Sequence, residues 1–129
     1  MTAVDTNILV RFLVKDDKTQ YESASAVFRS GDIFIPRTVI LETEWVLRYV
    51  YEFEPLRILE AFRSLFGLHN VHTEDFHIVA DAISLSESGL DFADAMHIAS
   101  SKGADKFMSF DKSLVRKASK LANMKVDTP

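Results

Sequence analysis

Apolar residues follow two patterns along this chain, one typical of strands and one typical of helices. The two patterns alternate, which predicts alternating strands and helices. Five compact runs are rich in β-branched or aromatic residues and are bounded by turn-forming residues, which is typical of short strands. These runs cover residues 2–5, 32–36, 70–73, 106–110 and 124–126. Between them, apolar positions repeat every three or four residues, as on one face of a helix. We predict helices over residues 8–14, 21–29, 37–51, 55–66, 75–88 and 112–121, and one that starts at Asp91.

This order of elements predicts an α/β fold. Strands that alternate with helices form parallel sheets, and right-handed crossovers place the helices on both faces. We therefore expect a three-layer α/β/α sandwich around a mostly parallel sheet of four or five strands. Because 129 residues suit one domain with its own core, residues 1–129 are predicted to form a single domain.

Composition narrows the class of protein. The hydrophobic fraction of 47% is that of an ordinary globular protein, and the absence of cysteine excludes disulfides and thiolate metal sites. The N-terminus shows no basic region followed by an apolar core, and no apolar run is long enough for a bilayer. We expect a soluble, cytoplasmic protein without membrane contact.

The charges are unevenly distributed along the chain. A net charge of −4 argues against binding nucleic acid through bulk charge. However, residues 64–101 contain six acidic residues and no Lys or Arg, whereas residues 102–125 carry seven basic residues against two acidic ones. An acidic centre beside a basic flank would suit a metal ion held next to a phosphate backbone, and it equally describes two solvated helix faces.

Acidic residues stand at the ends of two predicted strands. Asp5 closes the first strand, and Asp111 follows the fourth. Ligands of parallel sheets bind outside the carboxyl ends of the strands, so these two carboxylates would face one crevice if their strands are neighbours. Thr6 and Asn7, which follow Asp5, are predicted to cap the first helix.

A third acid, Glu42, interrupts an apolar stripe on the helix predicted over residues 37–51. The stripe consists of Val39, Val46, Tyr49 and Val50. A carboxylate on such a stripe is costly unless it is paired or binds a metal, so a structural and a functional role for Glu42 are equally open. Glu44 lies one turn before Arg48 and is predicted to form a surface ion pair with it.

Asp91 and Asp94 open the helix that follows. Residues three apart on a helix share a face, and the positive end of the helix dipole favours both carboxylates. Taken alone, such residues are most often structural, with Asp91 as the N-cap and Asp94 as a first-turn acid. Helices that begin near the strand ends would bring Glu42 and Asp94 to the crevice of Asp5 and Asp111.

Four carboxylates in one crevice predict a hard metal ion. Two unit charges about 4 Å apart repel by roughly 4 kcal/mol at an effective dielectric constant near 20. The cluster would therefore raise the pKa of some members or bind a cation. Oxygen ligands favour Mg²⁺ or Mn²⁺ over zinc, and such ions assist the attack of water on a phosphodiester.

With these residues in view, the sequence resembles PIN-domain endoribonucleases, and specifically VapC-type toxins of bacterial or archaeal toxin–antitoxin pairs. Four segments carry the resemblance, in the family's order and at its spacing. They are Val4-Asp5-Thr6-Asn7-Ile8-Leu9, Val39-Ile-Leu-Glu-Thr-Glu-Trp-Val-Leu47, Leu90-Asp-Phe-Ala-Asp-Ala-Met-His-Ile-Ala99 and Ser109-Phe-Asp111. The resemblance implies the α/β/α fold, RNA cleavage with Mg²⁺ or Mn²⁺, and a metal-binding, catalytic role for four acids. These acids are Asp5, Glu42, Asp94 and Asp111.

The resemblance also implies partners and supporting residues. The expected partners are single-stranded or loop RNA, a second copy in a homodimer, and a VapB-like antitoxin that covers the hairpin of residues 37–66 and directs a basic residue toward the acids. Asn7 and Ser109 match positions that hydrogen-bond and orient the acids, and Asp91 matches a position that is often acidic in similar relatives. Residues expected to contact RNA are Lys112, Arg116 and Lys117.

The aromatic and histidine side chains are weaker candidates for a functional role than the four acids. The aromatic residues of the hairpin are expected in the core or in a dimer contact rather than in a platform for stacking bases. They are Trp45, Tyr49, Tyr51, Phe53 and Phe66. His97 lies one turn after Asp94, where a packed or surface role is expected, and the other histidines share no metal-binding spacing.

Other functions stay open. A phosphoacceptor receiver domain is also an α/β protein that binds Mg²⁺ at strand ends, but it needs adjacent acids after its first strand and would leave Glu42 unexplained. A hydrolase with an aspartyl nucleophile needs a second acid two residues after the first, where Asn7 stands. A catalytically inactive PIN module used for binding is a further alternative, against which the presence of all four acids counts.

Overall fold

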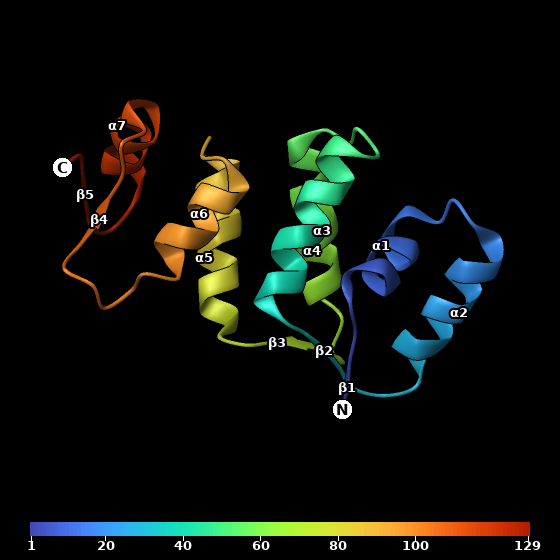
Figure 1. The fold of residues 1–129 in the computed structure, drawn as a ribbon. Coiled ribbons are helices and arrows are strands. Elements are labelled where there is room, and N and C mark those ends of the chain that lie inside the picture. The colour runs from blue at the N-terminus through green and yellow to red at the C-terminus, as the bar shows by residue number, and fades with distance from the viewer. The chain divides into compact units, whose positions relative to one another are not determined.

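A computed structural model describes all 129 residues, Met1–Pro129. The chain divides into two compact units, Met1–Glu74 and Asp75–Pro129. The predicted α/β class is confirmed, because seven helices accompany five strands and every strand pair is parallel (Figure 1). The strands lie in two sheets, three in the first unit and two in the second. None of the seven helices combines the length and the hydrophobicity that a membrane span requires.

The first unit is built on a three-stranded parallel sheet. Its strands are β1 (Thr2–Ala3), β2 (Ile33–Ile35) and β3 (Val71–Thr73), with β2 in the middle. Ile33 pairs with Thr2 on one side and with Val71 on the other. Ile33 and Ile35 are fully buried, so β2 forms the centre of this core. Both residues of β1 are exposed, and Val4, just after β1, is buried.

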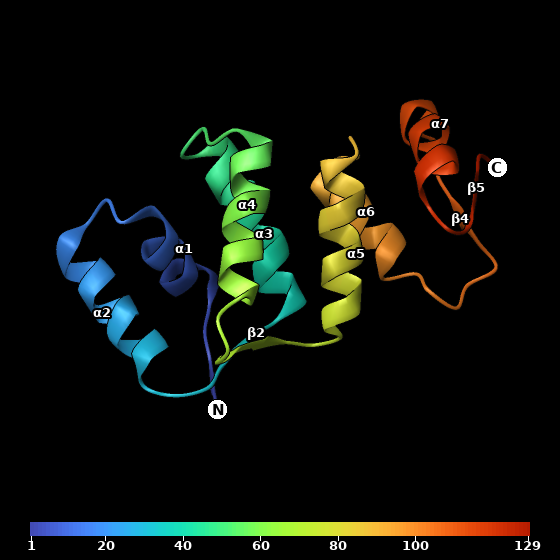
Figure 2. The same cartoon turned by 180° about the vertical axis from the view of Figure 1, so that it is seen from behind.

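Four helices connect these strands. They are α1 (Thr6–Val14), α2 (Lys18–Arg29), α3 (Arg37–Tyr49) and α4 (Pro55–Phe66). The pair α1 and α2 connects β1 to β2, and the pair α3 and α4 connects β2 to β3. α3 and α4 lie side by side, as both views show (Figures 1 and 2). α2 begins three residues earlier than predicted because the Asp17 side chain accepts a hydrogen bond from the Gln20 amide.

α3 buries a different face from the one that the apolar stripe predicted. Its buried residues are Ile40, Thr43, Glu44 and Leu47. Tyr49 and Val50 are 58% and 61% exposed, and Glu42 is exposed as well. Two apolar stripes run along this helix, and periodicity alone does not say which of them packs inward. Of the two locations expected for Trp45 and Tyr49, the core is therefore wrong, and the dimer contact stays a prediction.

The Glu44–Arg48 ion pair forms as predicted, but its surface location was wrong. Arg48 Nε and Nη2 lie 3.0 and 3.1 Å from the two Glu44 carboxylate oxygens. Glu44 is only 3% exposed. Burial of a charge is tolerated here because a guanidinium binds both oxygens of the carboxylate.

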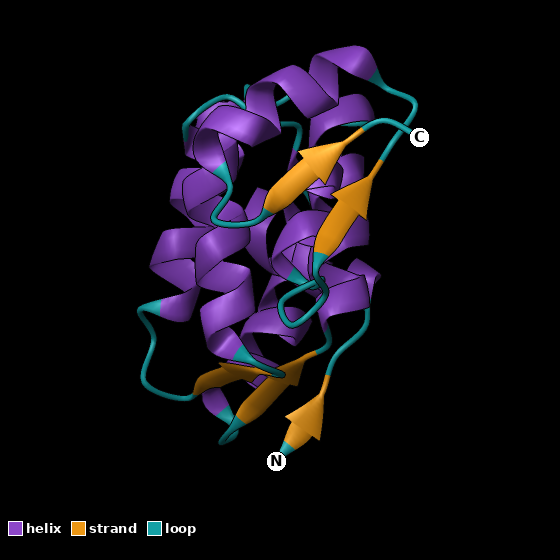
Figure 3. Ribbon diagram, turned by 90° about the vertical axis from the view of Figure 1, so that its left-hand side faces the viewer, coloured by secondary structure: helices purple, strands orange, loops and turns teal.

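The second unit combines a helical pair with a small sheet. Its elements are α5 (Phe76–Glu87), α6 (Phe92–Ala99), β4 (Lys106–Met108), α7 (Lys112–Leu121) and β5 (Lys125–Asp127). α5 packs against α6 after a turn at Gly89, whose positive φ of 118° suits glycine. β4 and β5 run parallel, with Phe107 opposite Val126, and α7 connects them (Figure 3).

β1 and β4 belong to different units. The adjacency of the strands that precede Asp5 and Asp111 therefore stays a prediction, as does the single domain of residues 1–129. Within each unit, however, a helix begins after the carboxyl end of each strand that precedes one, which places Asp5 between β1 and α1 and Asp111 between β4 and α7.

Candidate functional site

In the first unit, Asp5 and Glu42 line one cleft. The cleft has a volume of about 530 Å³, and its walls come from the start of α1 and from one face of α3. It is lined by Asp5, Thr6, Asn7, Val10, Val39, Glu42, Val46, Val50 and Tyr51. Because β1 and β2 are parallel neighbours, α1 and α3 start at the same edge of the sheet. The apolar stripe that contains Glu42 thus faces this cleft rather than the core.

A hydrogen bond joins the two walls of the cleft. The Thr6 hydroxyl donates to Glu42 Oε1. Sequence reasoning missed this contact and treated Thr6 only as a helix cap. The available signal was its position directly after Asp5 in the first of the four motif segments. Thr6 therefore orients the Glu42 carboxylate from the neighbouring helix.

Asp5 is the N-cap of α1. Its Oδ1 accepts a hydrogen bond from the Ile8 amide at 3.1 Å, so the caps predicted at Thr6 and Asn7 were wrong. Both of those residues lie in the first turn because the helix begins at Thr6, and Asn7 lies on the wall of the cleft. The cap bond uses one carboxylate oxygen, which leaves Oδ2 of Asp5 available to another ligand.

In the second unit, Asp91, Asp94 and Asp111 lie close enough to interact electrostatically. Asp91 caps α6 as predicted, accepting from the Asp94 amide at 3.2 Å. Burial raises the pKa of the Asp94 carboxyl, and the charges of Asp91 and Asp111 raise it further, while His97 opposes them. The charged form of Asp94 is thus disfavoured in the absence of a cation.

Asp111 is held at both its side chain and its backbone. Its Oδ1 caps α7 by accepting from the Leu114 amide at 3.1 Å. Its own amide donates to Ser109 Oγ at 3.0 Å. Ser109 therefore positions the backbone of Asp111 and makes no direct bond to its carboxylate. Three of the acids singled out from the sequence, Asp5, Asp91 and Asp111, are helix N-caps, where the helix dipole favours their negative charge.

The residues present fit a hard divalent cation by their chemistry. Within its own unit, none of the four acids Asp5, Glu42, Asp94 and Asp111 forms an ion pair with Lys or Arg. Their carboxylate oxygens are the donors that Mg²⁺ and Mn²⁺ prefer. In neither unit do three acidic or histidine side chains gather closely enough to hold an ion by themselves. The residues expected to contact RNA, Lys112, Arg116 and Lys117, are exposed on α7.

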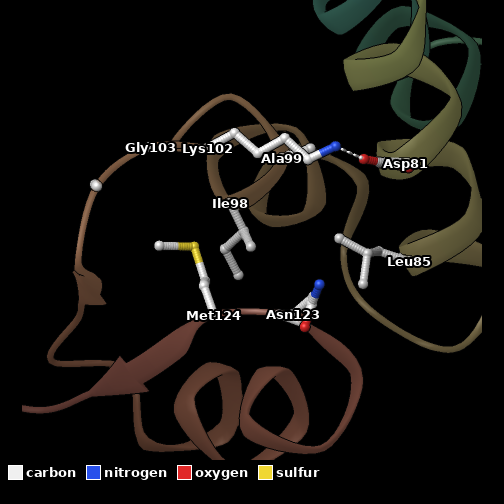
Figure 4. A pocket seen from close by; sticks show the side chains of 10 residues that line it. Asp81, Leu85, Ile98, Ala99, Lys102, Gly103, Asn123 and Met124 are labelled. Atoms are coloured by element: carbon white, nitrogen blue, oxygen red, sulfur yellow. Dashed lines mark hydrogen bonds and ion pairs between the residues drawn. The ribbon is translucent and has the colours of Figure 1, made fainter.

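A second hollow lies in the second unit, away from these acids. It measures about 140 Å³, and apolar side chains such as Leu85, Ile98 and Met124 line it (Figure 4). At its edge, Lys102 Nζ lies 2.6 Å from Asp81 Oδ2. Because Lys102 pairs with the only acid of this hollow, the hollow lacks the unpaired carboxylates that distinguish the cleft of Asp5 and Glu42.

The parallel strand pairs and the helices that connect them define an α/β protein with acids at the starts of α1, α6 and α7. The model of the PIN domain family matches residues 2–120, and the chain therefore belongs to the PIN domain family. PIN domains are generally metal-dependent nucleases that act on RNA, typically with Mg²⁺ or Mn²⁺. No curated protein was found to match this chain. The predicted membership of the family is confirmed, and the closer likeness to VapC-type toxins stays a prediction.

Proposed function

We propose that this protein is a Mg²⁺- or Mn²⁺-dependent endoribonuclease that hydrolyses RNA phosphodiester bonds and serves as the toxin of a type II toxin–antitoxin module. One observation carries the proposal. Within a PIN-domain sequence, Asp5, Asp94 and Asp111 stand at helix N-terminal ends and Glu42 faces the cleft from the middle of α3, and none of the four has a basic partner in its own unit. Unpaired carboxylates in such numbers are costly unless a cation compensates them.

The four acids would bind the cation, and neighbouring groups would orient them. When bound, the cation supplies Lewis-acid chemistry that activates water and neutralises the charge developing on the phosphate oxygens. Thr6 holds Glu42 through its hydroxyl, while the caps of α1 and α7 hold Asp5 and Asp111. A cation would stabilise the charged form of Asp94, which burial and neighbouring carboxylates otherwise disfavour.

The partners of the module are part of this proposal. RNA is the substrate, and its phosphates would meet the exposed Lys112, Arg116 and Lys117 of α7. A VapB-like antitoxin would cover the hairpin formed by α3 and α4 and direct a basic residue toward the acids. The active protein would be a homodimer in the cytoplasm, where both RNA and antitoxin are made.

The test is cleavage of end-labelled single-stranded and stem-loop RNA by the purified chain. We expect cleavage with Mg²⁺ or Mn²⁺, none in EDTA, and none by Asp94→Asn, whose fold is checked by circular dichroism. Asp17→Asn is the control, because it removes a carboxylate at a helix start that lies outside the candidate site. Cleavage that persists in EDTA or in Asp94→Asn would overturn the proposal.

A further inference from the structure

An exposed aromatic pair lies on α3 beside the cleft of Asp5 and Glu42. Trp45 and Tyr49 are 55% and 58% exposed, and their ring centroids are 5.4 Å apart. The guanidinium carbon of Arg48 lies 4.7 Å from the centre of the Tyr49 ring. Two aromatic rings and one flat cation thus form a small surface, which we call the α3 platform.

The α3 platform is adjacent to a candidate catalytic acid. Trp45 and Tyr49 follow Glu42 by three and seven residues, which corresponds to about 4.5 and 10.5 Å along the helix axis. Val46 and Val50, from the same stretch of helix, line the cleft itself. An extended chain whose phosphate reaches Glu42 would therefore pass next to these rings. In the second unit, Phe110 is 87% exposed directly before Asp111, so an exposed ring adjoins an acid there as well.

The buried Glu44 gives the α3 platform a fixed geometry. Both of its oxygens bind the Arg48 guanidinium, at 3.0 and 3.1 Å, and its side chain is almost completely buried. Arg48 is thereby held over the Tyr49 ring rather than free to sample other rotamers. A surface fixed before binding loses less conformational entropy when a ligand is bound.

The chemistry of the α3 platform favours nucleic-acid bases over a protein partner. Aromatic rings and Arg guanidinium planes stack on the faces of bases regardless of sequence. The two rings expose on the order of 300 Å² together, judged from the usual area of such side chains. A stable protein interface needs about 800 Å² from each partner.

We propose that Trp45, Tyr49 and Arg48 bind single-stranded RNA by stacking its bases next to the Glu42 side of the cleft. This inference rests on the proposed ribonuclease function, because it takes RNA as the ligand. The α3 platform would set the strand's direction across the acids, and it would favour unpaired over duplex RNA. An antitoxin that covers α3 and α4 would compete with RNA for the same rings.

Trp45 is the only tryptophan of the chain, so its fluorescence reports on the α3 platform directly. The full-length protein in EDTA is titrated with a single-stranded RNA of about ten nucleotides, within the usual site size of such proteins. A backbone of equal length without bases serves as the comparison. We expect saturable quenching by the RNA and none by the abasic strand. Tyr49→Ser should weaken RNA binding about tenfold, whereas Leu56→Ser, at an exposed apolar residue of α4, should not.

Two results would overturn the inference. One is that RNA does not quench the Trp45 fluorescence, or that the abasic strand quenches it equally. The other is a Trp45 emission that changes with protein concentration without RNA, in step with a doubling of mass by light scattering, because a second copy would then cover the rings. Cleavage with Mg²⁺ in the same samples is scored separately. Cleavage without base-dependent quenching refutes only the α3 platform, and quenching without cleavage refutes only the nuclease proposal.

Discussion

Substituting Asp111 by alanine and by asparagine should separate its two roles, the cap of α7 and the proposed cation ligand. The cap is a hydrogen bond of 3.1 Å from the Leu114 amide to Oδ1. Alanine removes this acceptor, and loss of an N-cap costs about 1 kcal/mol, which corresponds to about 4 °C in Tm for a chain of this size. Asparagine caps helices as well as aspartate does and removes the repulsion between Asp111 and Asp94, so Asp111→Asn should be at least as stable as the wild type and about 1 kcal/mol more stable than Asp111→Ala.

Activity should follow a different order from stability. Both variants lose the charge of a proposed ligand, so each should lose more than about 100-fold in Mg²⁺-dependent cleavage, since even residues that only orient metal ligands cost roughly 10–100-fold. Asp17 is the matched control, because it caps α2 with a 3.0 Å bond from the Gln20 amide. Asp17→Ala should lose as much stability as Asp111→Ala and keep its activity.

The measurements are urea unfolding in EDTA and initial cleavage rates on one labelled RNA. Asp111→Asn that cleaves RNA at the wild-type rate would refute the assignment of Asp111 as a ligand. Equal stability of Asp111→Ala and Asp111→Asn, which both lack the charge, would refute the assignment of the cap. The two conclusions are independent, because each rests on its own assay.

Asp94→Asn should make the metal-free protein more stable at neutral pH. Burial and two neighbouring carboxylates raise the pKa of Asp94, so its contribution to stability is present below the pKa of the unfolded chain and is lost as pH rises through the folded value. Urea unfolding should show the difference shrinking as the pH falls through that range, and a constant difference would contradict this reasoning. Two ion pairs should differ in the same assay. Arg48→Met, which removes the guanidinium bound to the buried Glu44, should cost on the order of 3 kcal/mol. Lys102→Met, at the exposed pair with Asp81, should cost less than about 1 kcal/mol. Similar losses of unfolding free energy in the two variants would show that burial does not determine how much each ion pair stabilises the protein.

The order of strands and helices could be predicted because local signals mark it. Capping aspartates, turn residues and the spacing of apolar side chains all act within a few positions, and they placed most element ends within a few residues. The inward face of α3 could not be predicted in this way. Ile40 and Leu47 compete there with Val39 and Val46, and the neighbouring elements determine which stripe is buried.

The candidate acids could be singled out from motifs and strand ends, but their surroundings could not. The bond from Thr6 to Glu42 joins residues 36 positions apart, and it exists because β1 and β2 are neighbours in the sheet. The burial of Glu44 likewise depends on packing around α3, since its spacing to Arg48 is the same in a surface pair. Contacts that depend on tertiary neighbours leave little trace in local sequence.

The capping aspartates have a consequence for how the site comes into being. A carboxylate that caps a helix loses its rotational freedom when that helix forms, so Asp5 and Asp111 are already oriented before any ligand arrives. Local fraying of the first turn of α1 or α7 would release the same carboxylate from its orientation. The fraction of molecules in which these acids are oriented for binding therefore depends on how often the first turns of α1 and α7 open. Amide hydrogen exchange at Ile8 and Leu114 measures this opening.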